Sequence, residues 1–152
     1  GVKRGCDLGT CGCCAVLVDG QPRLSCMTLA GDVEGCAITT VEGLADGHHL
    51  APIQTCFAEH GGSQCGFCTP GFLRSAQALL DQTSSPTEAQ VNEAIEGNLC
   101  RCTGYQPIVE SIMAAAALLR GEGEAPAPPT DPHADPHPAG PEEPQLPPGH
   151  AR

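Results

Sequence analysis

The residues most able to do chemistry in this chain are its cysteines, of which there are 11 among 152 residues. Four of them follow the spacing C-x4-C-x2-C, with a fourth after eleven intervening residues: Cys6, Cys11, Cys14 and Cys26. Plant-type 2Fe-2S clusters use this spacing for their ligands. Zinc sites favour C-x2-C pairs, so the first set favours an iron–sulfur cluster over zinc or buried free thiols.

Glycines in the same loop support an iron–sulfur interpretation. Gly5, Gly9 and Gly12 lie among the ligands, and glycine permits the positive φ angles that such a loop needs. Glycine also lets backbone N–H groups approach the cluster sulfurs, where hydrogen bonds tune the reduction potential. Cys13 lies in this loop too, and we interpret it as a small buried residue rather than a ligand.

A second set of cysteines forms two close pairs separated by 31 residues: Cys65 with Cys68, and Cys100 with Cys102. On spacing alone, this set could hold either zinc or an iron–sulfur cluster. Each pair stands just before a predicted helix. Two helix N-termini would direct their positive ends and free N–H groups at one anionic centre. The helices therefore favour a cluster, while the spacing leaves zinc open.

The remaining candidates for chemistry carry less information. Cys36 and Cys56 belong to neither set, and we interpret both as structural thiols. We find no nucleophile–base pair or phosphate-binding loop, so no catalytic residue is assigned. The histidines near the end of the chain are interpreted as solvated residues rather than metal ligands: His133, His137 and His150.

The first cysteine loop leads into a predicted β-hairpin. Residues 15–18 are predicted as a strand, Asp19 and Gly20 as a two-residue turn, and residues 21–24 as the return strand. A further strand is predicted over 38–41. This part of the chain would present the first cysteine set at one end of a small sheet.

Four helices are predicted after that sheet, over residues 51–60, 69–80, 85–95 and 103–120. Thr69 precedes Pro70, which suits an N-cap followed by proline in the first turn. Thr103 is predicted near the cap of the last helix. Apolar residues of that helix recur at helical spacing and predict one buried face: Ile108, Ile112, Ala115, Ala116 and Leu119.

Composition limits the class of protein. A formal charge of −11 argues against nucleic acid binding, and no apolar run is long enough for a membrane span. The odd cysteine count argues against a closed disulfide framework. Aromatic residues make up only 3%, so metal centres are expected to help hold the fold. Residues 121–152 hold ten of the 15 prolines and predict a disordered acidic tail.

Five sequence motifs together resemble a known family: GCDLGTCGCCAVLVDG, SCMTLA, TTVEGLA, QCGFCTPG and GNLCRCTGY. They resemble the small iron–sulfur subunit of the molybdenum hydroxylases, which include xanthine dehydrogenase, aldehyde oxidoreductase, aerobic carbon monoxide dehydrogenase and 4-hydroxybenzoyl-CoA reductase. The resemblance runs from residue 1 to about residue 120. The pairing of QCGFCTPG with GNLCRCTGY is its most specific part, and it favours a cluster at the second cysteine set.

The resemblance implies an α+β fold in three parts. Residues 1–43 would be a plant-type ferredoxin-like β-grasp domain that lacks its N-terminal β-hairpin. Residues 44–120 would be a four-helix domain that binds a 2Fe-2S cluster, and residues 121–152 would be the disordered acidic Pro-rich tail. The first 2Fe-2S cluster would be held by Cys6, Cys11, Cys14 and Cys26. The second would be held by Cys65, Cys68, Cys100 and Cys102. Gln64 and Cys102 match family residues that contact the molybdopterin.

The implied function is electron transfer within a molybdenum-containing oxidoreductase. Single electrons would pass from a molybdopterin in a large subunit through both clusters to FAD in a medium subunit, or to another acceptor. Substrate chemistry would take place in another chain, and the complex would work in the cytoplasm. Two alternatives are a stand-alone ferredoxin-like electron carrier and a zinc-binding interaction module without redox activity.

Overall fold

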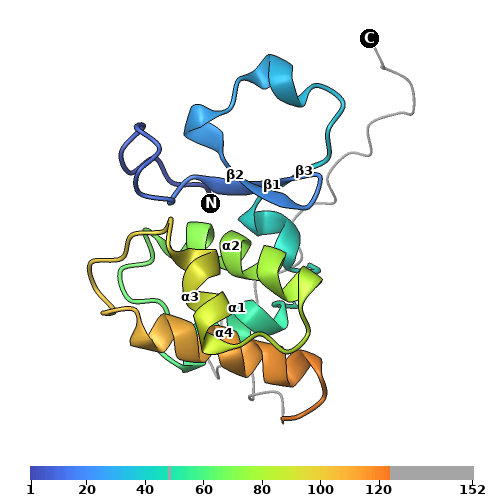
Figure 1. Cartoon of the computed structure of the whole chain (residues 1–152), viewed down its shortest axis with the longest axis vertical. Helices are drawn as coiled ribbons and strands as arrows, with labels where there is room; N and C mark the ends of the chain where they lie inside the picture. Colours follow the sequence, from blue (N-terminus) through green and yellow to red (C-terminus); the bar gives the residue numbers. More distant parts are fainter. Residues whose placement is uncertain (48, 124–152) are drawn as a thin grey trace, which may run out of the picture.

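The computed structural model describes residues 1–47 and 49–123. The predicted tail lies outside the described residues from residue 124 onward, together with the histidines His133, His137 and His150. The described part is a mixture of helices and a small antiparallel sheet (Figure 1). Its strands are β1 (Ala15–Val18), β2 (Gln21–Leu24) and β3 (Ile38–Thr39). Its α-helices are α1 (Pro52–Glu59), α2 (Thr69–Gln82), α3 (Glu88–Ile95) and α4 (Gln106–Leu119).

The predicted hairpin is confirmed in both strands and in the turn. β1 pairs antiparallel with β2, with Val18 opposite Gln21. The turn residues Asp19 and Gly20 have φ angles of 48° and 77°. Two successive positive φ angles match the twist of the flanking strands, which is why Asp-Gly suits this position.

The third strand is shorter than predicted. β3 ends at Thr39, where it pairs with Leu17 on the other side of β1. The prediction over 38–41 is wrong in its second half, because a 3-10 helix begins at Val41. Thr40 accepts a hydrogen bond from the Gly43 amide at 3.0 Å, which closes this turn. The sheet order is therefore β2-β1-β3, with β1 at the centre.

The four predicted helices are present, with shifts at some ends. Helix α3 has a capping box, in which the Thr87 side chain accepts from the Gln90 amide. The N-cap of α2 is Cys68, one residue earlier than the predicted Thr69. α4 begins at Gln106, later than Thr103 suggested. Among the described residues, no helix has both the length and the apolar character that crossing a bilayer requires.

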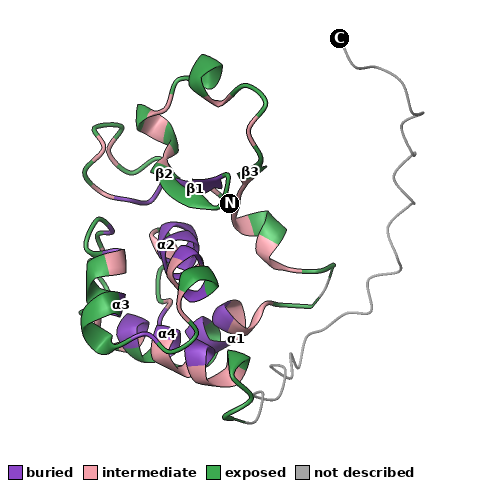
Figure 2. Cartoon of the chain, turned by 45° about the vertical axis from the view of Figure 1, so that its right-hand side comes forward, coloured by how far each residue is buried: buried purple, intermediate pink, exposed green. Residues whose placement is uncertain are grey.

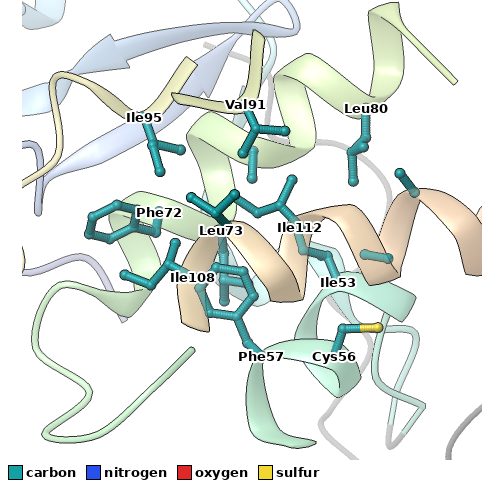
Figure 3. Close-up of a cluster of buried hydrophobic side chains, with 14 residues drawn as sticks. Ile53, Cys56, Phe57, Phe72, Leu73, Leu80, Val91, Ile95, Ile108 and Ile112 are labelled. Carbon is teal, nitrogen blue, oxygen red and sulfur yellow. The ribbon is translucent and has the colours of Figure 1, made fainter. Parts of the chain in front are cut away.

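The hydrophobic core lies among the helices. Phe57, Phe72, Ile108 and Ile112 are at most 1% exposed and point toward one another from α1, α2 and α4 (Figure 3). The sheet packs on α2 through β1, whose four residues are all buried. Helix α2 therefore touches both the sheet and the other helices, and it fixes one against the other (Figure 1).

The segment after the β1–β2 turn contributes little to any core. None of the described residues from 19 to 52 is buried, and Figure 2 shows this region in green and pink. It includes β2, β3 and three short 3-10 helices. Hydrophobic burial alone does not account for its order, so other interactions have to hold this region in place.

Candidate metal centres

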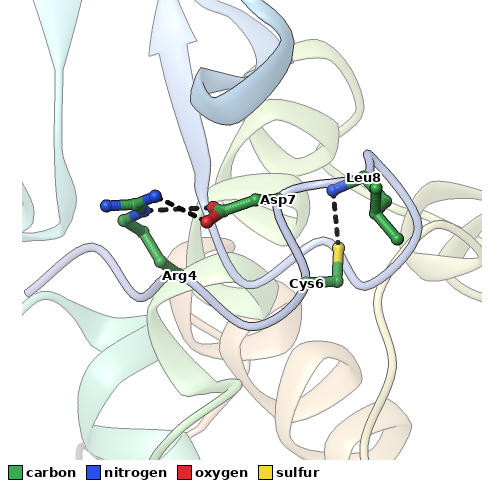
Figure 4. Close-up of polar contacts among 4 residues, drawn as sticks. All are labelled: Arg4, Cys6, Asp7 and Leu8. Carbon is green, nitrogen blue, oxygen red and sulfur yellow. Dashed lines mark hydrogen bonds and ion pairs between the residues drawn. The ribbon is translucent and has the colours of Figure 1, made fainter.

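The first cysteine loop wraps around the sulfur of Cys6. The Leu8 amide donates to Cys6 Sγ at 3.4 Å (Figure 4), and the Thr10 amide donates to the same sulfur at 3.4 Å. The Thr10 hydroxyl and these amides lower the pKa of the Cys6 thiol to about 6. Arg4 Nε donates to Asp7 Oδ1 at 3.0 Å and holds the start of the loop. The local geometry thus favours a negative charge on this sulfur.

Glycine serves this loop in two ways. Gly9 and Gly12 have φ angles of 73° and 72°, as the sequence predicted. Gly5 instead provides space, because a Cβ there would lie 2.9 Å from Cys11 Sγ. The winding of the loop therefore depends on glycine for both backbone conformation and close approach.

The four predicted thiols of the first set lie together as two pairs. The Cys6 thiol contacts that of Cys11. Cys26 lies in the 3-10 helix Ser25–Met27 after β2. Its interaction with Cys14, the residue directly before β1, raises the pKa of Cys26. Cys6 is close enough to Cys26 to raise its pKa further. The β-hairpin thus brings the distant fourth cysteine back to the loop.

The thiols of the second set are paired in the same manner. Cys65 contacts Cys102, and the two are exposed. Cys68 contacts Cys100, and both are half-buried. Burial, followed by the contact with Cys100, raises the pKa of Cys68 to about 12. The set therefore has an outer pair facing solvent and an inner pair against the helices.

Hydrogen bonds stabilise the charge on the inner sulfur of Cys100. Burial opposes ionisation there, but the Thr103 hydroxyl and amide lower the pKa of Cys100. Thr103 Oγ1 lies 3.1 Å from Cys100 Sγ, and the Thr103 amide lies 3.5 Å from it. These donors belong to the loop before α4, because α4 begins only at Gln106. The expectation of a helix start directly beside Cys102 is therefore wrong.

Three side chains around the sites were not singled out by sequence reasoning: Thr10, Asn98 and Tyr105. The Tyr105 hydroxyl accepts from the Cys100 amide at 3.1 Å and donates to the Asn98 carbonyl at 3.3 Å. The sequence predicts Thr103 only as a residue near the cap of the last helix. The sequence signal for these residues is that each has a hydroxyl or side-chain amide group and lies within a few positions of a cysteine.

The other cysteines have different surroundings. Cys13 is buried, as expected, and its Sγ lies 3.8 Å from the Cys11 carbonyl. Cys56 is 2% exposed within the helical core, which supports its structural interpretation. Cys36 is only half-buried and contacts the Asp19 carboxylate, which raises its pKa. The exposed Gln64 directly precedes the outer thiol of Cys65.

The donor sets fit a two-iron cluster. Within residues 1–47 and 49–123, no three His, Cys, Asp or Glu side chains converge closely enough to hold one metal ion. A structural zinc ion needs all four ligands close to a single centre. A 2Fe-2S cluster instead takes four thiolates in all, two for each of its irons. In each set the thiols lie near one another in two pairs, close enough to shift a partner's pKa, and this arrangement suits that requirement.

Comparisons with known proteins agree with this fit. Residues 40–113 match the model of the [2Fe-2S] binding domain family. The small subunit of nicotine 6-hydroxylase from Paenarthrobacter nicotinovorans is 54% identical over 78% of this chain and 72% of that protein. The iron–sulfur-binding subunit of xanthine dehydrogenase from Escherichia coli O157:H7 is 46% identical over 74% of this chain and 72% of that protein.

Solved structures show the same relationship. Quinoline 2-oxidoreductase from Pseudomonas putida 86 superposes with a TM-score of 0.75 at 48% identity, covering 81% of this chain and 78% of that chain. Aldehyde oxidoreductase from Desulfovibrio desulfuricans gives 0.79 at 45% identity, covering 82% of this chain but 14% of that much longer one. The chain therefore belongs to the family of small iron–sulfur subunits of the molybdenum hydroxylases.

Proposed function

We propose that this chain transfers single electrons inside a molybdenum hydroxylase complex by means of two 2Fe-2S clusters. The observation that carries the proposal is the proximity of thiols within each set. Cys6 lies near Cys11, Cys26 near Cys14, Cys65 near Cys102 and Cys68 near Cys100, each pair close enough for one thiol to shift the pKa of the other. When bound, each cluster accepts and releases one electron at a time. The chain's own part is to hold the clusters, tune their potentials and shield the inner sulfurs from water.

The first cluster is assigned to Cys6, Cys11, Cys14 and Cys26. Cys14 is buried, and the Cys6 sulfur receives two backbone N–H groups. Donors to a sulfur stabilise the more negative, reduced state of a cluster. These residues therefore favour an electron on the first cluster.

The second cluster is assigned to Cys65, Cys68, Cys100 and Cys102. Its outer pair and the neighbouring Gln64 are exposed, so this side is free to meet another chain. We assign Gln64 and Cys102 to contact with a molybdopterin held by a large subunit. This places the second cluster on the molybdenum side and the first cluster toward the acceptor, a FAD-binding medium subunit.

The division of the chain follows from the same assignment. Residues 1–43 are proposed as a ferredoxin-like domain and residues 44–120 as the helical cluster domain. We place the complex in the cytoplasm, where thiols stay reduced. The subunit role is favoured over a stand-alone carrier or a zinc module because relatives that match most of this chain are themselves subunits of oxidoreductases.

The assignment is tested by iron and sulfide analysis of the full chain purified anaerobically. We expect about four irons and about four labile sulfides per chain. Cys14→Ser and Cys100→Ser should each lose about half of both, each removing a different paramagnetic signal after reduction. Cys36→Ser is the matched control, since Cys36 lies outside both quartets, and it should keep all of them. A colourless wild-type chain containing zinc would refute the assignment.

The order of the two clusters is tested in the assembled complex. Cys65→Ser should stop the reduction of the flavin by substrate, while substrate binding at the molybdenum site survives. The reason is that every electron must cross the second cluster before it reaches the first. Flavin that still becomes reduced at the wild-type rate in this variant would contradict the proposed order.

A further inference from the structure

Direct hydrogen bonds join the two cysteine loops, although they lie far apart in the sequence. The Leu99 amide donates to the Cys11 carbonyl at 2.9 Å. The Asn98 side-chain amide donates to the Gly12 carbonyl at 3.0 Å, across 86 residues of sequence. Cys11 belongs to the first quartet, and Leu99 immediately precedes Cys100 of the second. We call this contact between residues 11–12 and 98–99 the seam.

Close packing of glycine backbone makes the seam possible. A Cβ at Gly12 would lie 2.4 Å from the Gly97 carbonyl oxygen. A Cβ at Gly71, in the first turn of α2, would lie 2.3 Å from the Gly12 carbonyl oxygen. Both distances are far shorter than any real contact, so the backbone of the first loop packs directly against Gly97 and α2, with the Asn98 side chain beside it.

Asn98 connects the seam to the ligands of the second quartet. Its side chain is 4% exposed and points to the first loop, where it satisfies the Gly12 carbonyl. Its own carbonyl accepts from the Tyr105 hydroxyl, which in turn accepts from the Cys100 amide. A continuous set of hydrogen bonds therefore runs from Gly12 through Asn98 and Tyr105 to Cys100.

We propose that Asn98 is a positioning residue that fixes the separation and relative orientation of the two cluster quartets. This inference rests on the proposed function. Electron transfer and magnetic interaction between two centres both fall steeply as their separation grows. A rigid seam would keep the separation of the two quartets constant while the partner chains move. A flexible connection between the sheet and the helices would let that separation vary.

The test uses the full chain with both clusters reduced. Electron paramagnetic resonance reports the magnetic interaction between the clusters as a splitting of their signals. Asn98→Leu keeps the size of the side chain but removes the donor to Gly12. We expect this variant to keep about four irons per chain and to lose or narrow the splitting. Asn92→Leu, an exposed position on α3, is the matched control and should leave the splitting unchanged.

A second variant guards against a folding defect in the first. Gly71→Ala removes no hydrogen-bonding group. Its Cβ would instead push the Gly12 carbonyl away from α2. It should change the same splitting. An unchanged splitting in either variant with full iron content would overturn the proposal. If both variants lose both clusters while Asn92→Leu keeps them, the seam is merely structural and the positioning role is also overturned. A wild-type chain without iron would instead refute the proposed function itself.

Discussion

Hydroxyl and amide donors beside the cysteine sulfurs are the chain's most local means of setting a reduction potential. Leu8 and Thr10 donate to Cys6, while Thr103 donates to Cys100. Each donor stabilises negative charge on a sulfur, and reduction adds one negative charge to a cluster. The two sites therefore each have their own donors, and one can be altered without the other.

Thr103→Val should lower the potential of the second cluster and leave the first unchanged. The substitution removes the hydroxyl that lies 3.1 Å from Cys100 Sγ. One hydrogen bond is worth about 1 kcal/mol, which corresponds to roughly 40 mV for a one-electron step. Redox titration followed by paramagnetic resonance measures both potentials separately. Thr55→Val, in α1 and away from both sites, is the control, and equal shifts in both clusters would contradict this prediction.

Sequence spacing predicted two sets of four cysteines, and their role as iron ligands stays a prediction. The spacing did not reveal Asn98 or Tyr105. Asn98 acts on a residue 86 positions away, and no local pattern encodes such a contact. Tyr105 holds a φ angle of 71°, which is unusual for an aromatic residue. Its two hydroxyl hydrogen bonds stabilise that conformation, and neither is visible in the sequence.

At the scale of elements, the four helices and the β1–β2 hairpin were predicted, whereas the length of β3 and the start of α4 were not. Helical spacing of apolar residues and caps such as Thr87 act within a few residues. The length of β3 depends instead on where β1 ends and on the turn that starts at Val41. The start of α4 is delayed because Gly104 and Tyr105 both have positive φ angles, which an α-helix does not allow.

Stability should depend on the inner face of α4 far more than on its outer face. Ile112 is 0% exposed, whereas Leu119 on the same helix is 53% exposed. Ile112→Ala should cost about 2–5 kcal/mol because it leaves a cavity in the helical core. Leu119→Ala should change stability by about 0.5 kcal/mol or less. Urea unfolding followed by helical circular dichroism compares them, and similar losses in both variants would contradict the assigned core.

At the scale of the whole molecule, the hydrophobic core and the proposed metal centres hold different parts of the chain in place. This difference can be measured. The helices bury a cluster of apolar side chains, whereas none of the described residues from 19 to 52 is buried. The first cluster is therefore expected to replace a core in that region.

Anaerobic removal of iron should loosen the sheet region before the helices. Hydrogen exchange measured by mass spectrometry should speed up over residues 19–47. Residues 73–82 of α2 and 109–118 of α4 should keep most of their protection, because their packing does not involve a cluster. A chain reloaded with iron and sulfide is the control and should recover slow exchange. Uniform loss of protection along the whole chain would show that no such division exists.

The distance in sequence between Asn98 and Gly12 also has a consequence for biosynthesis. A ribosome that adds about 5–20 residues per second needs roughly 4–17 s to cover those 86 positions. Throughout this interval the nascent chain exposes Cys6, Cys11 and Cys14 without the segment on which their loop docks. We therefore expect these thiols to be most sensitive to oxidation during translation, before the segment around Asn98 has been made.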